Sequence, residues 1–155
     1  MLPHHPRSWA LHLQAHGPWL LVAEAFDFRS TMPDSEYYRR AVGGMDSSRF
    51  GERGLDYSAG IRVYDISHPA QPRAVSFLEV PGLGVHRIWW TGGRYAYAST
   101  LLDGFSDHIL IVVDLIDPVQ PTVVGRSKAS PVRPSCSVAW VRVSVRPLAL
   151  AISSG

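Results

Sequence analysis

Two stretches of the chain, GIRVYDISHPAQP at residues 60–72 and ILIVVDLIDPVQP at residues 109–121, repeat one pattern 49 positions apart. Each ends a run of β-branched residues in an aspartate, Asp65 or Asp114, which is followed by two prolines. The prolines are Pro69, Pro72, Pro118 and Pro121. The β-branched run predicts a strand, and we assign the aspartates and prolines a structural role in the turn that ends it. A chain that repeats strand and turn in this way is predicted to repeat a whole structural unit.

A second correspondence extends that unit towards the N-terminus. The stretch RSWALHLQAHGPWLLVAEAF (7–26) aligns with GLGVHRIWWTGGRYAYASTL (82–101) at an offset of 75, and each reads as strand, glycine-containing turn and strand. The unit closes with a fourth strand, RAVSFLEV (73–80) or TVVGR (122–126). Four short strands per unit are typical of a propeller blade. The sequence therefore predicts an all-β, propeller-type fold with about two four-stranded antiparallel blades, which is a partial propeller.

The predicted organisation is a first blade over 7–80, with a long insertion loop at 27–59, and a second blade over 82–126. Because a ring closes with about four to eight blades, we expect the chain to be a fragment of a larger ring. The tail, 127–155, contains no acidic residue and no repeat. Two interpretations of it remain open, a frameshift or false stop near residue 126 and a divergent terminal strand.

Composition restricts the class of protein. The chain has 155 residues, of which 46% are hydrophobic and 18% charged, as expected for one globular domain. All 13 acidic residues lie at or before Asp117, so the net charge of +2 reflects the tail and predicts no nucleic-acid surface. Cys136 is the single cysteine, which excludes a disulfide framework. With no visible signal peptide or apolar run of about 18 residues, the default expectation is a soluble, cytoplasmic protein.

The segments YDISHPAQP and VVDLIDPVQP resemble the LVIVD repeat of bacterial and archaeal β-propeller proteins. The resemblance is closest from about Gly60 to Arg126. The LVIVD-repeat family that this part of the chain resembles is uncharacterised. The resemblance implies propeller blades but little about activity, because one fold hosts many functions. We expect a non-catalytic scaffold that binds an unknown protein or small molecule, with no nucleic acid and no membrane span. Open blade edges leave self-association, including assembly of several copies into a ring, as a further expectation.

His86 is the preferred site residue, as a metal or ligand contact, with Arg87 beside it as a second ligand contact. It lies on a predicted first strand, and in propellers this strand lines the central channel. The alternative function is a metal-dependent, oxidase-like or hydrolase-like propeller enzyme with a histidine-lined channel. We assign no catalytic residue, and no cofactor apart from a metal ion in a complete ring. His12 and His16 are the nearby candidates, but strict alternation places His12 and His86 on opposite faces, which argues against a two-histidine site.

Two loops are weaker candidates. Asp103, Asp107 and His108 allow a metal-binding loop, although the same residue types suit an ordinary turn. The loop at 27–59 mixes tyrosine, phenylalanine and arginine, which suits a lid or a partner contact as well as a flexible insertion. His4 and His5 are expected at the surface. No G-x-S-x-G, phosphate-loop or H-E-x-x-H motif occurs, so serine-hydrolase and nucleotide chemistry are not predicted.

Overall fold

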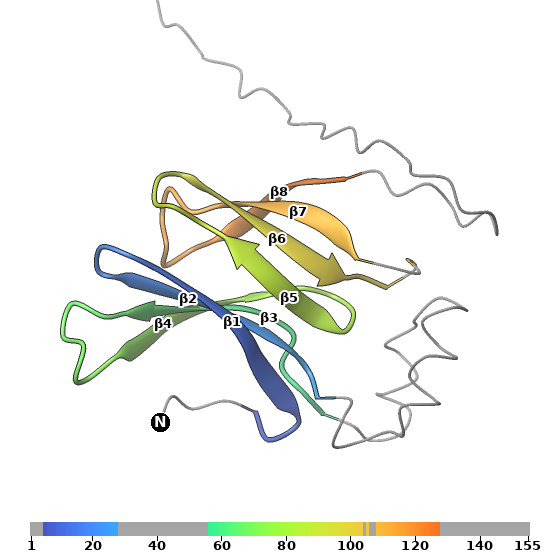
Figure 1. The fold of residues 1–155 in the computed structure, drawn as a ribbon, viewed down its shortest axis with the longest axis horizontal. Helices are drawn as coiled ribbons and strands as arrows, with labels where there is room; N and C mark the ends of the chain where they lie inside the picture. Colours follow the sequence, from blue (N-terminus) through green and yellow to red (C-terminus); the bar gives the residue numbers. More distant parts are fainter. Residues whose placement is uncertain (1–4, 28–55, 104, 106–107, 128–155) are drawn as a thin grey trace, which may run out of the picture.

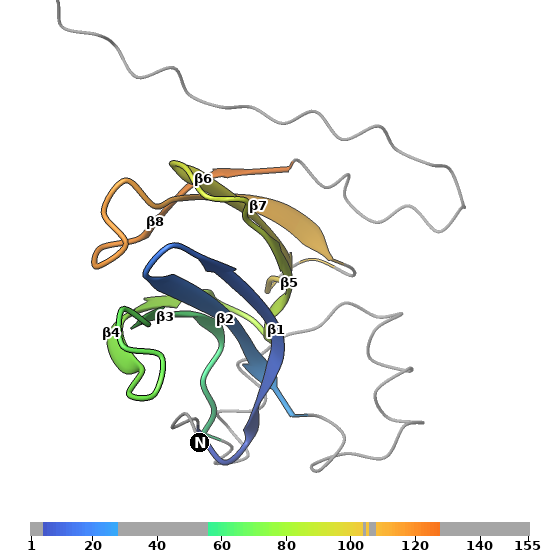
Figure 2. The ribbon, with the colours of Figure 1, turned by 60° about the vertical axis from the view of Figure 1, so that its left-hand side comes forward.

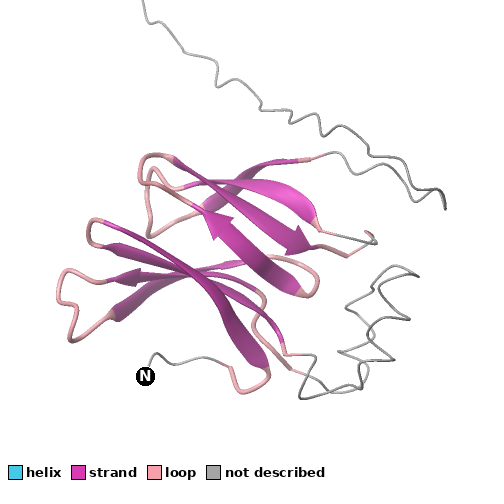
Figure 3. Cartoon of the chain, in the orientation of Figure 1, coloured by secondary structure: helices cyan, strands magenta, loops and turns pink. Residues whose placement is uncertain are grey.

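The computed structural model describes residues 5–27, 56–103, 105 and 108–127, and these residues contain strands and no helix (Figures 1 and 3). The strands are β1 (Ser8–His16), β2 (Trp19–Phe26), β3 (Gly60–Asp65), β4 (Arg73–Glu79), β5 (Gly84–Trp89), β6 (Tyr95–Leu101), β7 (Ile109–Asp114) and β8 (Thr122–Arg126). All their pairings are antiparallel. In this part of the chain, no helix is long and apolar enough to cross a membrane.

The strands form two meanders of four, which we call blade 1 (β1–β4) and blade 2 (β5–β8). Consecutive strands pair within each blade, and one backbone bridge, Ala25 to Gly84, joins β2 to β5. The resulting sheet is strongly curled, with blade 2 folded over blade 1 (Figure 2). The all-β, propeller-type fold with two four-stranded antiparallel blades is therefore confirmed.

The strand registers show which residues of the two blades are equivalent. Trp19 pairs with Asp65, and Tyr95 pairs with Asp114, so β2 and β6 correspond at an offset of 76 rather than the expected 75. The first strands, β1 and β5, keep the offset of 75, because their register shifts lie at Ala10/His12 and at Val85/Arg87. The extra position falls in the β5–β6 turn, where a longer loop changes the offset without changing the strands.

The core lies between the facing surfaces of the two blades. Period-2 alternation places every second residue of β6 in it, so Ala96 and Ala98 are fully buried while Tyr97 between them is 45% exposed. Blade 1 contributes Leu21, Ala23, Ile61 and Val63, and blade 2 adds Val85, Ile88, Ile111 and Val113. The largely aliphatic contact holds the blades together although only one backbone bridge joins them.

Each blade uses opposite faces for equivalent residues. Leu21 is in the core, and its equivalent at the offset of 76 is Tyr97, on the face of blade 2 that points away from blade 1. Trp89, the register partner of Tyr97, is 53% exposed on the same face. The blades thus stack front to back, as the blades of a propeller do.

Several sequence expectations lie outside the described residues. These are the tail from 128 onward, most of the insertion loop (28–55), His4 and Asp107.

Candidate binding pocket at the blade junction

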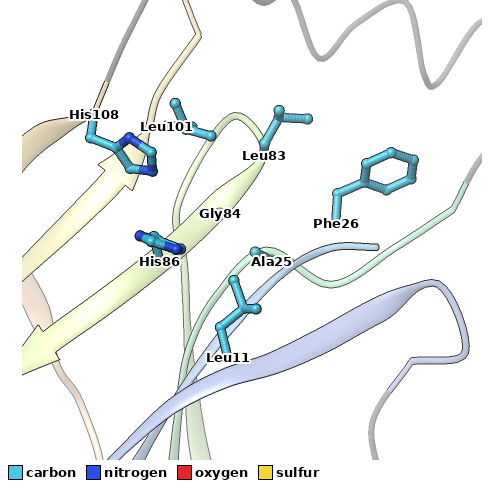
Figure 4. A pocket seen from close by; sticks show the side chains of 8 residues that line it. All are labelled: Leu11, Ala25, Phe26, Leu83, Gly84, His86, Leu101 and His108. Carbon is cyan, nitrogen blue, oxygen red and sulfur yellow. The ribbon is translucent and has the colours of Figure 1, made fainter. Parts of the chain in front are cut away.

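A small pocket opens where the first strands of the two blades approach each other (Figure 4). It has a volume of about 60 Å³ and is mainly apolar, with two imidazoles at one end. Its lining residues, which define the junction pocket, are Leu11, Ala25, Phe26, Leu83, Gly84, His86, Leu101 and His108. A space of this size admits a few water molecules or a small chemical group.

β-Bulges place one side chain from each blade in the junction pocket. In β1 the register passes from Ala10 directly to His12, and in β5 it passes from Val85 directly to Arg87. The residues left without a register partner are Leu11 and His86, which are 75 positions apart and therefore equivalent. A bulge re-aims the side chain of its extra residue, so both side chains reach the pocket.

His86 faces a second histidine across the pocket. The ring centroids of His86 and His108 are 4.9 Å apart, with the planes tilted by 45°. Partial desolvation of the imidazole lowers the pKa of His86 although the residue is exposed, and electrostatic interactions with His108, Arg87 and His12 lower it further. The neutral ring, which has a free lone pair for a ligand or metal, is therefore favoured at neutral pH.

The expectation that His12 and His86 face opposite ways rested on strict alternation, and that premise is wrong. The two bulges interrupt the alternation at these positions. His12 instead connects the blades, because its Nδ1 accepts a hydrogen bond of 3.2 Å from the backbone N–H of Ile88. This contact fixes the neutral tautomer with the proton on Nε2.

The apolar side of the pocket depends on a close backbone approach. The N–H of Phe26 donates to the carbonyl of Leu83 at 2.8 Å, next to the bridge between Ala25 and Gly84. Gly84 has a φ of +104°, and a Cβ atom added there would lie 2.5 Å from the carbonyl oxygen of Glu24. Only glycine fits this position without moving the backbone.

Arg87, His16 and His5 lie away from the pocket lining. Arg87 is exposed and acts on His86 through its charge. His16 packs edge-on against Trp90, with the ring centroids 5.8 Å apart. His5 Nε2 forms a 3.0 Å hydrogen bond with Oδ2 of Asp56.

The aspartates of the repeat hold the turns that follow them. Asp65 Oδ1 accepts hydrogen bonds from the backbone N–H (2.9 Å) and the hydroxyl (2.6 Å) of Ser67, and these bonds lower the pKa of Asp65 to about 2, with Arg73 adding to the effect. Asp114 Oδ1 accepts the N–H of Ile116 at 2.9 Å. Arg94 donates to both carboxylate oxygens of Asp114 and is the main cause of its lowered pKa.

The proline-containing turns are built alike in both blades. In the turn with Pro69 and Pro72, the N–H of Gln71 donates to the carbonyl of His68 at 2.8 Å. In the turn with Pro118 and Pro121, the N–H of Gln120 donates to the carbonyl of Asp117 at 3.0 Å. The four bonded residues match at the offset of 49, so the repeat extends to the backbone hydrogen bonds.

Sequence reasoning did not identify most of the pocket. The sequence pattern groups His108 with Asp103 and Asp107, and no spacing rule links it to His86, 22 residues earlier. Leu11 had one available signal, its offset of 75 from His86. Phe26 and Leu101 had none, because their place depends on how the blades pack.

The described part of the chain contains no group of three or more histidine, cysteine, aspartate or glutamate residues arranged to hold a metal ion. His86 and His108 alone come together as a pair of nitrogen ligands at the junction pocket. No protein-family model matches the chain, and a search of curated proteins finds no matching relative.

Proposed function

We propose that this protein is a non-catalytic binding module of the LVIVD-repeat propeller type, and that its ligand is bound in the junction pocket. One observation carries the proposal: the equivalent bulges of β1 and β5 direct Leu11 and His86 into one cavity between the blades. Small-molecule sites are typically concave and apolar, with a few polar groups that fix orientation. The junction pocket has this composition, and none of its lining residues is a serine, threonine, cysteine or carboxylate that would act as a nucleophile.

The test is a titration of methyl-labelled full-length protein with short-chain carboxylic acids, amides and amines. Metal is first removed with a chelator, which is then kept present. We expect at least one probe to shift the NMR methyl signals of Leu11, Leu83 and Leu101 in a saturable way, while the exposed methyls of Val123 and Val124 on β8 stay in place. Equal or absent shifts at the two sets of methyl groups would overturn the proposal.

A metal-dependent propeller enzyme is the second candidate, and the approach of His108 to His86 favours it. Catalytic metal sites usually combine about three protein ligands with an open position. The described residues supply two, so this candidate needs a further donor. Stoichiometric metal in the purified protein, together with turnover of a test ester or oxidation of a test thiol that is lost in His86→Ala, would favour this candidate over the binding module.

A further inference from the structure

The two imidazoles of the junction pocket lie at a separation that suits a shared metal ion. A metal ion lies about 2.0–2.1 Å from a ligating imidazole nitrogen, and so about 3.2 Å from the ring centroid. Two imidazoles on one ion, at an angle near tetrahedral, then have centroids about 5 Å apart. The centroids of His86 and His108 are 4.9 Å apart.

The junction pocket offers a bound ion two imidazole rings, and imidazole is a common ligand of transition-metal ions. A neutral imidazole is the form that ligates metals. The His86 ring makes no hydrogen bond to another described residue, so metal binding there breaks no existing bond within this part of the protein.

We propose that His86 and His108 bind a divalent transition-metal ion of the class that prefers imidazole, such as Zn²⁺, Ni²⁺ or Cu²⁺, at the polar end of the junction pocket. The inference rests on the proposed binding function of the same pocket. Two protein ligands leave coordination positions for water or for a donor atom of the bound ligand. The adjoining space of about 60 Å³ accommodates a water molecule, which needs about 10–15 Å³.

The anchoring of the two ligands supports this assignment. His86 is held by the bulge of β5, and His108 directly precedes the buried start of β7 at Ile109. One ligand thus lies on β5, and the other lies in the loop immediately before β7. Attachment to these two strands limits the backbone reorganisation that metal binding requires.

The experiment is calorimetric titration of the full-length protein, freed of metal, with ZnCl₂ and separately with NiCl₂. We expect saturable binding of one equivalent. Loss of even a residue that only supports a ligand weakens metal binding about tenfold or more, so His86→Ala and His108→Ala should each weaken it at least about tenfold. His68→Ala, in the exposed β3–β4 turn, is the matched control and should bind as the unmodified protein does. His5→Ala removes the adjacent His4–His5 pair as a competing ligand and should also leave the affinity unchanged.

Paramagnetic broadening locates the bound ion. With Ni²⁺ present, the methyl signals of Leu11 and Leu101 should broaden before those of Val123. Absence of saturable binding, an unchanged affinity in either His86→Ala or His108→Ala, or loss of binding in His5→Ala would overturn the metal site. Circular dichroism of each variant shows whether it is folded.

The two experiments distinguish the metal site from the proposed binding function, because the organic probes are tested with chelator present. Probe binding without metal binding rejects the metal site alone. Metal binding without probe binding rejects the proposed organic-ligand function alone.

Discussion

Arg62 forms a two-pronged ion pair with Glu24, whose side chain is only 1% exposed. Nη2 of Arg62 lies 3.0 Å from Oε2 of Glu24, and the guanidinium also stacks on Phe77, 4.5 Å from the ring centroid. The equivalent positions of blade 2, at offsets of 76 and 49, hold Thr100 and Ile111, and both are buried. Ile111 belongs to the core between the blades, and the hydroxyl of Thr100 donates to the carbonyl of Gly84. Blade 1 therefore has an ion pair at the position where blade 2 has a threonine and an isoleucine.

This difference predicts an asymmetric response to mutation. Glu24→Ala leaves the guanidinium of Arg62 unpaired, and removing one member of a buried pair typically lowers the free energy of unfolding by about 3 kcal/mol. The double variant Glu24→Thr, Arg62→Ile installs the blade 2 residues and should recover most of that loss. Urea denaturation of the two variants measures the effect. A double variant less stable than Glu24→Ala would show that the pair itself is required.

Gly84 at the blade junction is predicted to tolerate no side chain. Gly84→Ala places a Cβ atom 2.5 Å from the carbonyl oxygen of Glu24 and should destabilise the protein severely. Gly93→Ala is the matched control, because Gly93 has a φ of +85° but no heavy atom within 4 Å of the added Cβ. The control should lose only the conformational term of about 1–2 kcal/mol. Thermal unfolding of both variants separates the effect of the steric clash from that of backbone strain. An equal loss of stability in the two variants would contradict the close approach of Gly84 to the Glu24 carbonyl.

Acid should remove the contribution of Asp65 to stability. Its pKa is about 2 in the folded protein and about 3.9 in an unfolded chain, so the folded state holds the carboxylate more strongly. That contribution is fully present above pH 4 and is lost as the pH falls towards 2. In Asp65→Asn this part of the pH dependence should be absent. Denaturation curves at intervals between pH 2 and pH 5 test the expectation, and parallel curves for the two proteins would contradict it.

His86 should titrate below the usual value for histidine. Its pKa is lowered by partial desolvation first and by the electrostatic interaction with His108 second, so His108→Ala should move it part of the way back towards 6.5. Because the unfolded chain binds the proton more readily, the contribution of His86 to stability is present above about pH 6.5 and falls as the pH drops through the folded pKa. NMR titration of the imidazole signals measures the pKa directly. A value at or above 6.5 would contradict the assigned environment.

The sequence predicted the features that depend on local pattern. The aspartate and proline spacing located β3 and β7 and the turns after them, because turn chemistry acts over a few residues. The bulges at Leu11 and His86 were not predicted, since one extra residue in a strand leaves no distinct period. The bridge to Gly84 and the approach of His108 to His86 depend on packing between segments that are far apart in the chain. No spacing pattern within a single sequence predicts such contacts.

The bulges separate recognition from folding. The residues at 11 and 86 have no register partner, so their side chains can change while the neighbouring backbone ladder keeps its pairing. One position supplies an alkyl group and the other an imidazole, although the backbone device is the same in both blades. Substitutions at these two sites therefore offer a direct route to redesigning ligand selectivity on an unchanged scaffold.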